Sequence, residues 1–191
     1  MIARATITFY ILTLSLMLSG CGVHYMVKGQ VVDAVTKQPI EGAVVAVEWY
    51  YIQWMSCLIP LTSGHETVAN ADSITDADGM FTIPRYHHIT TGGHFMGAYK
   101  EGYICWNNEE FFNPDGKTTE EMFTPRRDPG VYEGMVIELE PIKKEGFPVL
   151  EHAKFVSSIR DRVAAENFFF ATKKEREIES ESNRKNMGIK K

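Results

Sequence analysis

Three histidines, His87, His88 and His94, lie close together in the sequence, and their imidazoles could bind a metal ion. Neutral imidazole is a common ligand of zinc and copper. In an extended segment His87 and His88 point to opposite faces, whereas His88 and His94 could converge across a turn. The sequence therefore leaves two alternatives: a metal site on His88 and His94, with a metal-dependent enzyme built on it, or solvated loop histidines.

Three tryptophans, Trp49, Trp54 and Trp106, are candidate ligand-binding aromatics. Exposed aromatic rings stack on sugars or fill pockets in a partner protein, whereas buried rings enlarge a core. Trp54 belongs to an aromatic insertion, residues 51–64, which is too short to span a bilayer. The sequence thus permits a carbohydrate-binding surface on this insertion, with burial of the rings as the alternative.

The sequence contains none of the common catalytic motifs: no Gly-rich phosphate loop, no His-Glu-x-x-His and no Gly-x-Ser-x-Gly. Glu109 and Glu110 are adjacent on a polar stretch, without the apolar surroundings that raise a carboxyl pKa, and are predicted to be solvated. The acidic run Asp76 to Gly79 does not fit a calcium loop, because Ile74 and Arg85 would occupy ligand positions, and it is predicted to be a turn. We therefore expect no enzymatic activity, no catalytic residues and no cofactor.

The N-terminus has the pattern of an export signal. Arg4 precedes an apolar stretch from Ala5 to Leu18, whose 14 residues suit a signal peptide and fall short of the ~20 that a spanning helix needs. The quartet Leu18-Ser19-Gly20-Cys21 then resembles the bacterial lipobox. This resemblance implies a bacterial lipoprotein in which residues 1–20 are removed and Cys21 carries diacylglycerol, with a fatty acid such as palmitate on its amine. The alternative is an ordinary secretory signal or a short anchor.

The predicted mature chain is mildly acidic. Removal of residues 1–20 removes only Arg4 among the charged residues, so the formal charge changes from −5 to −6. This charge argues against nucleic acid as a partner and gives no general attraction to an anionic bilayer, so membrane contact should come from the lipid. Residues 21–25 would be the anchor and a short spacer. Residue 22 is Gly. An Asp at this position would resemble an inner-membrane retention signal, so its absence favours the outer membrane if the organism is Gram-negative.

Cys57 and Cys105 remain as an even pair once Cys21 is assigned to the lipid. Export would place them where disulfides form. A bond between them would close a loop of about 48 residues, which in the chain-entropy model adds about 4 kcal/mol of stability. The alternative, two separate buried thiols, stays open.

Short strands are predicted along most of the chain. The candidates share β-branched and aromatic residues between Gly, Pro or Asp turns: residues 26–33, 43–51, 66–74, 80–83, 94–99, 103–106 and 131–139. This pattern is typical of a β-sandwich. From Val149 to Phe170 apolar residues recur at helical spacing, which predicts one amphipathic helix packed on the sandwich, and the charged tail 173–191 would extend it or fray.

Several motifs resemble the carboxypeptidase regulatory-like family. The run Val27-x-Gly29-x-Val31-x-Asp33-x-x-Thr36-x-x-Pro39-Ile40-x-Gly42-Ala43-x-Val45 is similar to its opening, and three later stretches are similar to its central turn, later turn and closing strand: residues 75–83, 98–103 and 136–139. The resemblance implies an all-β Greek-key sandwich of transthyretin type over residues 26–142. The helix and tail predicted from the apolar spacing occupy 143–191. It implies no catalysis by this module.

Together these features predict a lipid-anchored, non-enzymatic module of the cell envelope. Its expected role is binding or scaffolding of a protein partner through the long loops or the C-terminal helix. Carbohydrate binding through the aromatics of 51–64 is the alternative, and metal binding through His88 and His94 is the weaker one.

Overall fold

The structure is a computed structural model that describes residues 25–52, 65–86, 93–112, 131–143 and 145–187. In chain order its elements are β1 (Tyr25–Asp33), β2 (Val44–Ile52), β3 (His65–Ile74), β4 (Met80–Arg85), β5 (Gly93–Tyr99), β6 (Trp106–Asn107), β7 (Met135–Leu139), α2 (Val149–Val163), α3 (Glu166–Ala171) and α4 (Lys173–Asn186). The predicted strands are confirmed with two differences: β6 shares only Trp106 with the predicted 103–106, and β7 begins at Met135, later than the predicted 131–139.

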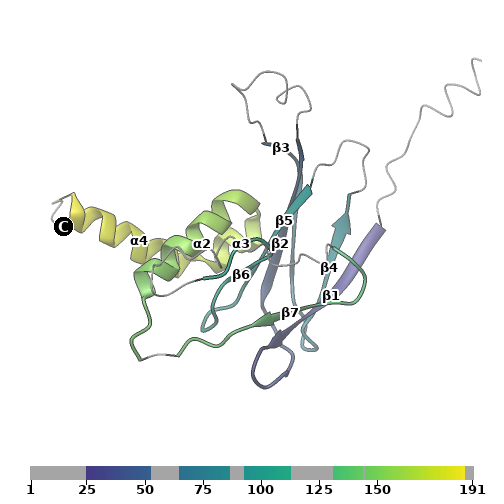
Figure 1. The fold of residues 1–191 in the computed structure, drawn as a ribbon, viewed down its shortest axis with the longest axis horizontal. Coiled ribbons are helices and arrows are strands. Elements are labelled where there is room, and N and C mark those ends of the chain that lie inside the picture. The colour runs from purple at the N-terminus through teal and green to yellow at the C-terminus, as the bar shows by residue number, and fades with distance from the viewer. Residues whose placement is uncertain (1–24, 53–64, 87–92, 113–130, 144, 188–191) are drawn as a thin grey trace, which may run out of the picture.

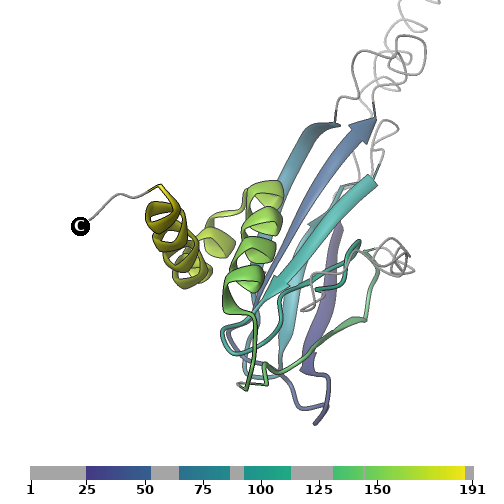
Figure 2. The ribbon, with the colours of Figure 1, turned by 60° about the vertical axis from the view of Figure 1, so that its left-hand side comes forward.

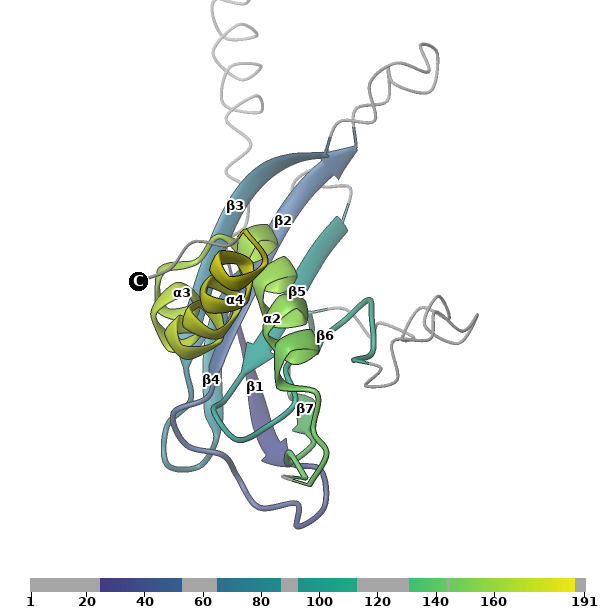
Figure 3. The ribbon, with the colours of Figure 1, turned by 90° about the vertical axis from the view of Figure 1, so that its left-hand side faces the viewer.

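Two sheets form a β-sandwich, as the strand pattern predicted. One sheet has the order β4-β1-β7, with β1 antiparallel to β4 and parallel to β7. The other has the order β3-β2-β5-β6 and is antiparallel throughout. Helices α2 and α3 lie against this second sheet, over β2, β3 and β5, and α4 packs on the outer side of α2 (Figures 1 and 3). The molecule therefore has three layers: sheet, sheet and helices.

Strand β2 is buried on both faces, which explains its nearly continuous apolar sequence. Val45 and Val47 face the first sheet and pack in a core with Phe81 and Ile137. The alternate residues of the same strand, such as Ala46, face the helices in a second core. The apolar alternation of β7, in contrast, marks one buried and one exposed face. One core thus lies between the two sheets, and a second core lies between the second sheet and the helices.

Tight packing explains the glycine at position 29. A Cβ at Gly29 would collide with the Phe81 ring and lie 2.8 Å from Cγ of Met135. Both neighbours are buried in the sandwich core. Gly29 therefore sets how closely β1 approaches the side chains of β4 and β7.

Replacement of Gly29 with alanine is expected to lower the free energy of unfolding by about 1–3 kcal/mol, because an added methyl overpacks the core. Urea denaturation followed by circular dichroism measures the change. The neighbouring Lys28→Ala change, at an exposed position, serves as the control. Equal stability of the two variants would contradict the packing described here.

The turn predicted at residues 75–79 is confirmed, but it is not a hairpin turn, because β3 and β4 belong to different sheets and the turn leads from one sheet to the other. Oδ1 of Asp76 accepts hydrogen bonds from the amides of Asp78 and Met80, at 3.0 and 2.9 Å, and Gly79 has a φ of +70°. The buried hydroxyl of Thr75 accepts from Ala43 N and donates to the Ile40 carbonyl. The Asp76 side chain therefore stabilises the backbone of this turn.

The C-terminal region forms three helices in the described residues, so the prediction of one helix over 149–170 was wrong. The chain leaves α2 at Ala164, whose φ of +45° is left-handed, and Ala165 is extended. This break lets α3 place Phe168, which is fully buried, into the second core. The helix α4 then continues through the charged tail as far as Asn186 and lies beside α2 (Figure 2).

Candidate functional site

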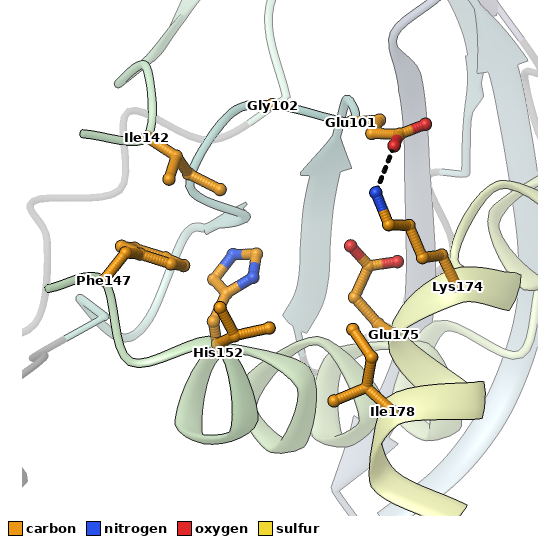
Figure 4. Close-up of a pocket in the computed structure, with 9 residues that line it drawn as sticks. Glu101, Gly102, Ile142, Phe147, His152, Lys174, Glu175 and Ile178 are labelled. Atoms are coloured by element: carbon orange, nitrogen blue, oxygen red, sulfur yellow. Dashed lines mark hydrogen bonds and ion pairs between the residues drawn. The ribbon is translucent and has the colours of Figure 1, made fainter. Parts of the chain in front are cut away.

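A cavity of about 370 Å³ lies between the helices and the end of the second sheet. Its lining comes from the turn after β5, the segment that leads into α2, and the helices α2 and α4 (Figure 4). The lining residues are Glu101, Gly102, Ile142, Phe147, Val149, His152, Lys174, Glu175 and Ile178. A volume of ~300–1,000 Å³ is typical of small-molecule and side-chain pockets.

His152 is a buried, neutral wall of this cavity. The residue lies in the first turns of α2 and is 3 % exposed, and its Nε2 accepts a hydrogen bond of 3.0 Å from the amide of Cys105. Burial lowers the pKa of His152 to about 4. Since Nε2 accepts, the neutral ring carries its proton on Nδ1. His152 therefore contributes a hydrogen-bond donor and no positive charge near neutral pH.

Glu175 brings a carboxylate into the same cavity from α4. The residue is 8 % exposed, and its Oε2 is buried without a hydrogen-bond partner in the described part of the chain. Burial, together with the hydrogen bond to Glu175 and the charge of that carboxylate, raises the pKa of the Tyr99 phenol. Tyr99 thus stays protonated and donates to Glu175, which leaves the carboxylate only partly satisfied.

The rim of the cavity carries one exposed ion pair. Nζ of Lys174 lies 2.6 Å from Oε1 of Glu101, and both side chains are about two-thirds exposed. The Lys174 hydrogen bond and charge lower the pKa of Glu101, and Glu101 in turn raises the pKa of Lys174. A pair this exposed adds little to stability. With Lys174 neutralised by Glu101, Glu175 gives the cavity a formal charge of −1.

Apolar side chains form the remaining walls. Phe147 packs against the His152 ring, with 5.3 Å between ring centroids, and Ile142, Val149 and Ile178 complete the surface. His152 is poorly suited to act as a general base, because its Nε2 is engaged and its pKa lies far below neutral pH. The arrangement is suited to binding a group that combines an apolar body with a positive charge.

A second, open hollow of about 610 Å³ lies over β2 beside the end of α2. Its Arg162 donates to Glu109, with Nη2 2.8 Å from Oε1, and its guanidinium lies 3.8 Å from the centre of the Phe95 ring. The prediction that Glu109 is simply solvated was therefore wrong. Because Arg162 also lies 3.8 Å from Glu48, the charges of this hollow are engaged in holding α2 to the sheet.

The tryptophans named from the sequence do not gather at one surface in the described residues. Trp49 is 3 % exposed and packs edge-on against Tyr86, so it serves the sandwich core. Trp106 is half-buried beside a small hollow of about 40 Å³ that Phe111 and Glu138 also line. Trp54 lies outside the described residues.

The cysteines and histidines named from the sequence lie partly inside and partly outside the described residues. Cys21, Cys57 and His88 lie outside the described residues, so lipidation, the disulfide and the metal site on His88 and His94 stay predictions. Cys105 is buried, with its Sγ 3.4 Å from the Ala98 carbonyl, and His94 lies on β5 opposite Trp49. Within the described ranges, no group of three or more His, Cys, Asp and Glu side chains is arranged to hold a metal ion.

None of the helices in the described segments has the length and apolar character needed to cross a membrane.

Sequence reasoning missed the cavity, because its polar residues are far apart in the chain. Glu101, His152 and Glu175 belong to a turn and two different helices. One signal was available: His152 lies three residues after Val149 and four before Val156, on the apolar side of the predicted helix, whereas Glu175 stands in the charged segment and carried no such signal. A titratable residue on the apolar side of a predicted helix is a reason to expect a polar pocket there.

No protein-family model matches the sequence, and no curated protein matches it significantly. Among solved structures, catechol 1,2-dioxygenase from Pseudomonas arvilla C-1 is similar at 15 % identity, with 68 % of this chain and 56 % of that chain covered and a TM-score of 0.38. 3-Chlorocatechol 1,2-dioxygenase from Rhodococcus opacus 1CP is similar at 14 % identity, with 65 % of this chain and 62 % of that chain covered and a TM-score of 0.37. The major pilin SpaD from Corynebacterium diphtheriae is similar at 12 % identity, with 60 % of this chain and 29 % of that chain covered and a TM-score of 0.32.

The chain spans less than two thirds of the length of each of these three proteins. The described strands form an all-β sandwich, and helices follow it at the C-terminal end.

Proposed function

We propose that this protein is a non-enzymatic, lipid-anchored module that binds a protein partner in the cell envelope. Cys21 is the proposed attachment site, and the outer membrane is the proposed location if the cell is Gram-negative. Residues 26–142 form the proposed carboxypeptidase regulatory-like sandwich, of the Greek-key transthyretin type. The helices in 143–191 supply the binding surface.

One observation carries the binding part of the proposal: the cavity whose floor is Glu175. A buried carboxylate with an unpaired oxygen is unfavourable for folding alone, so it is usually retained for a reason other than stability. Apolar walls around a few polar groups are the common composition of binding sites. The cavity opens on the helical layer, which agrees with the prediction that the C-terminal region meets the partner.

The anchor part of the proposal rests on the Leu18-Ser19-Gly20-Cys21 quartet. Strand β1 begins at Tyr25, four residues after Cys21. An acylated Cys21 with two or three chains would hold the protein on a bilayer durably, because each buried methylene adds about 0.8 kcal/mol. The short spacer would keep the sandwich close to the membrane surface.

Carbohydrate binding is the second candidate, and it depends on Trp54 and Trp106 since Trp49 is buried. The hollow beside Trp106, at about 40 Å³, is far smaller than the ~300–1,000 Å³ that is typical of small-molecule sites. Only stacking on an open face would remain for a sugar there. The cavity at Glu175 therefore favours the protein-binding proposal.

Photo-cross-linking in intact cells tests the protein-binding proposal. A p-benzoylphenylalanine at Lys174, on the exposed rim of the cavity, is expected to form one covalent adduct with a partner protein. The same group at Val136, 53 % exposed on β7 in the other sheet, is expected to give none. Adducts of equal yield from the two positions, or no adduct from either, would contradict binding at the helical layer.

A further inference from the structure

We propose that the cavity at Glu175 receives a lysine or arginine side chain of the partner, with the cationic end paired to the Glu175 carboxylate and the stem against the apolar walls. This inference rests on the proposed function of binding a protein, and it adds the chemistry by which the partner is recognised.

In the described part of the chain the Glu175 carboxylate forms no ion pair, and the nearby Lys174 ammonium, whose charge also acts on it, is paired with Glu101. Tyr99 donates one hydrogen bond to it, while Oε2 has no hydrogen-bond partner among the described residues. Lys174 is adjacent in sequence, yet its ammonium points to Glu101 (Figure 4). A buried carboxylate requires a partner charge or further hydrogen bonds. An incoming ammonium or guanidinium group would supply both.

The electrostatics of the cavity favour a cation over an anion. His152 is neutral near pH 7 because burial lowers its pKa to about 4, so it does not repel a cation. Glu101 and Glu175 outweigh the single positive charge of Lys174. An anionic group would face the Glu175 carboxylate inside an apolar enclosure, where like charges repel strongly.

The apolar walls select an organic cation rather than a metal ion. Calcium and magnesium prefer six or more oxygen ligands, including waters. The cavity offers one buried carboxylate, Glu175, among apolar side chains, and its other carboxylate, Glu101, is paired with Lys174 at the rim. A lysine or arginine side chain has a methylene stem that packs on apolar surface while its charged end reaches a polar group. In the cavity the apolar walls would contact the methylene stem, and Glu175 would pair with the charged end.

Methyl NMR on the full-length protein, purified as cells make it and kept in nonionic detergent, tests the inference. The probe is Nα-acetyl-lysine N-methylamide, and the control ligand is its neutral isostere with a methyl group in place of the ammonium group, the N-methylamide of Nα-acetyl-2-aminoheptanoic acid. The lysine probe is expected to shift the δ1 methyl signals of Ile142 and Ile178, with an affinity at least tenfold higher than that of the isostere. Equal affinities, or no shift of either methyl, would overturn the inference.

Two variants make the test specific to the carboxylate. Glu175→Gln keeps the shape and the bond from Tyr99, and it is expected to weaken the lysine probe at least tenfold while leaving Tm unchanged or raised. Glu177→Gln, at an exposed position on the same helix, is expected to bind like wild type. A fall in Tm of several degrees in Glu175→Gln would contradict a carboxylate held for binding, as would unchanged affinity for the probe.

The outcomes separate this inference from the proposed function. If the lysine probe binds through Glu175 but Lys174 gives no partner adduct in cells, the cation site stands and protein binding fails. If the adduct forms from Lys174 but Glu175→Gln binds the probe like wild type, protein binding stands and the cation site fails.

Discussion

Replacement of Phe168 with alanine is expected to lower the free energy of unfolding by about 3–5 kcal/mol, the usual effect of removing a fully buried phenylalanine. The side chain is 0 % exposed, and its ring lies edge-on to Tyr99 at 6.2 Å between centroids. It also packs with Val156 and Ile159 of α2. Its loss would open a cavity between the sheet and the helices. Urea denaturation measures the change.

The same short helix offers a matched control. Phe170 belongs to α3 and is 63 % exposed. Its replacement with alanine is expected to change the free energy of unfolding by no more than about 0.5 kcal/mol. Similar losses in the two variants would show that α3 does not anchor the helical layer through Phe168.

Acidification is expected to destabilise the protein through His152. The folded pKa of about 4 lies below the ordinary value of 6.5, so the unfolded chain binds the extra proton first as pH falls. The neutral ring therefore contributes full stability above pH 6.5, and this contribution is lost between pH 6.5 and 4. At 1.36 kcal/mol for each unit of pKa, the loss is about 3 kcal/mol.

The variant His152→Gln isolates this contribution from that of other titrating groups. Its side-chain carbonyl can still accept the Cys105 amide, but it does not titrate. The variant is less stable than wild type near pH 7, and the gap should narrow by about 3 kcal/mol on going to pH 4. Parallel stability curves for the two proteins, measured by denaturation at each pH, would show that His152 does not control the acid response.

The sandwich was predictable because its signals are local. The strands carry β-branched runs and alternation, and the turn at Asp76 and Gly79 combines an acceptor side chain with a residue that adopts positive φ. Gly29 marks a place where no side chain fits. Such signals depend on neighbours in the sequence, so they can be recognised without knowledge of long-range contacts.

The break in the C-terminal helix was not predictable from local preference. Ala164 and Ala165 are good helix formers, yet one is left-handed and the other extended. The reversal is favoured because it buries Phe168 against Tyr99, a contact between residues far apart in the chain. Here tertiary packing outweighs intrinsic propensity.

The candidate site was hidden for a related reason. His152, Glu175 and Glu101 come together only when α4 turns back along α2 toward the turn after β5. Their spacing in the sequence matches no motif. The sequence directed attention to tryptophans and histidines because those residue types suggest chemistry, and one of them, Trp49, proved to be part of the core.

The central claim, a binding module held on a membrane by its first mature residue, is tested most directly by intact-protein mass spectrometry. Wild type and Cys21→Ser would be extracted from the same cells. For wild type the account predicts a chain that begins at Cys21 and carries the added mass of diacylglycerol, with or without a further acyl group. For Cys21→Ser it predicts no lipid mass. A wild-type chain without lipid, or one that retains residues 1–20, would contradict it.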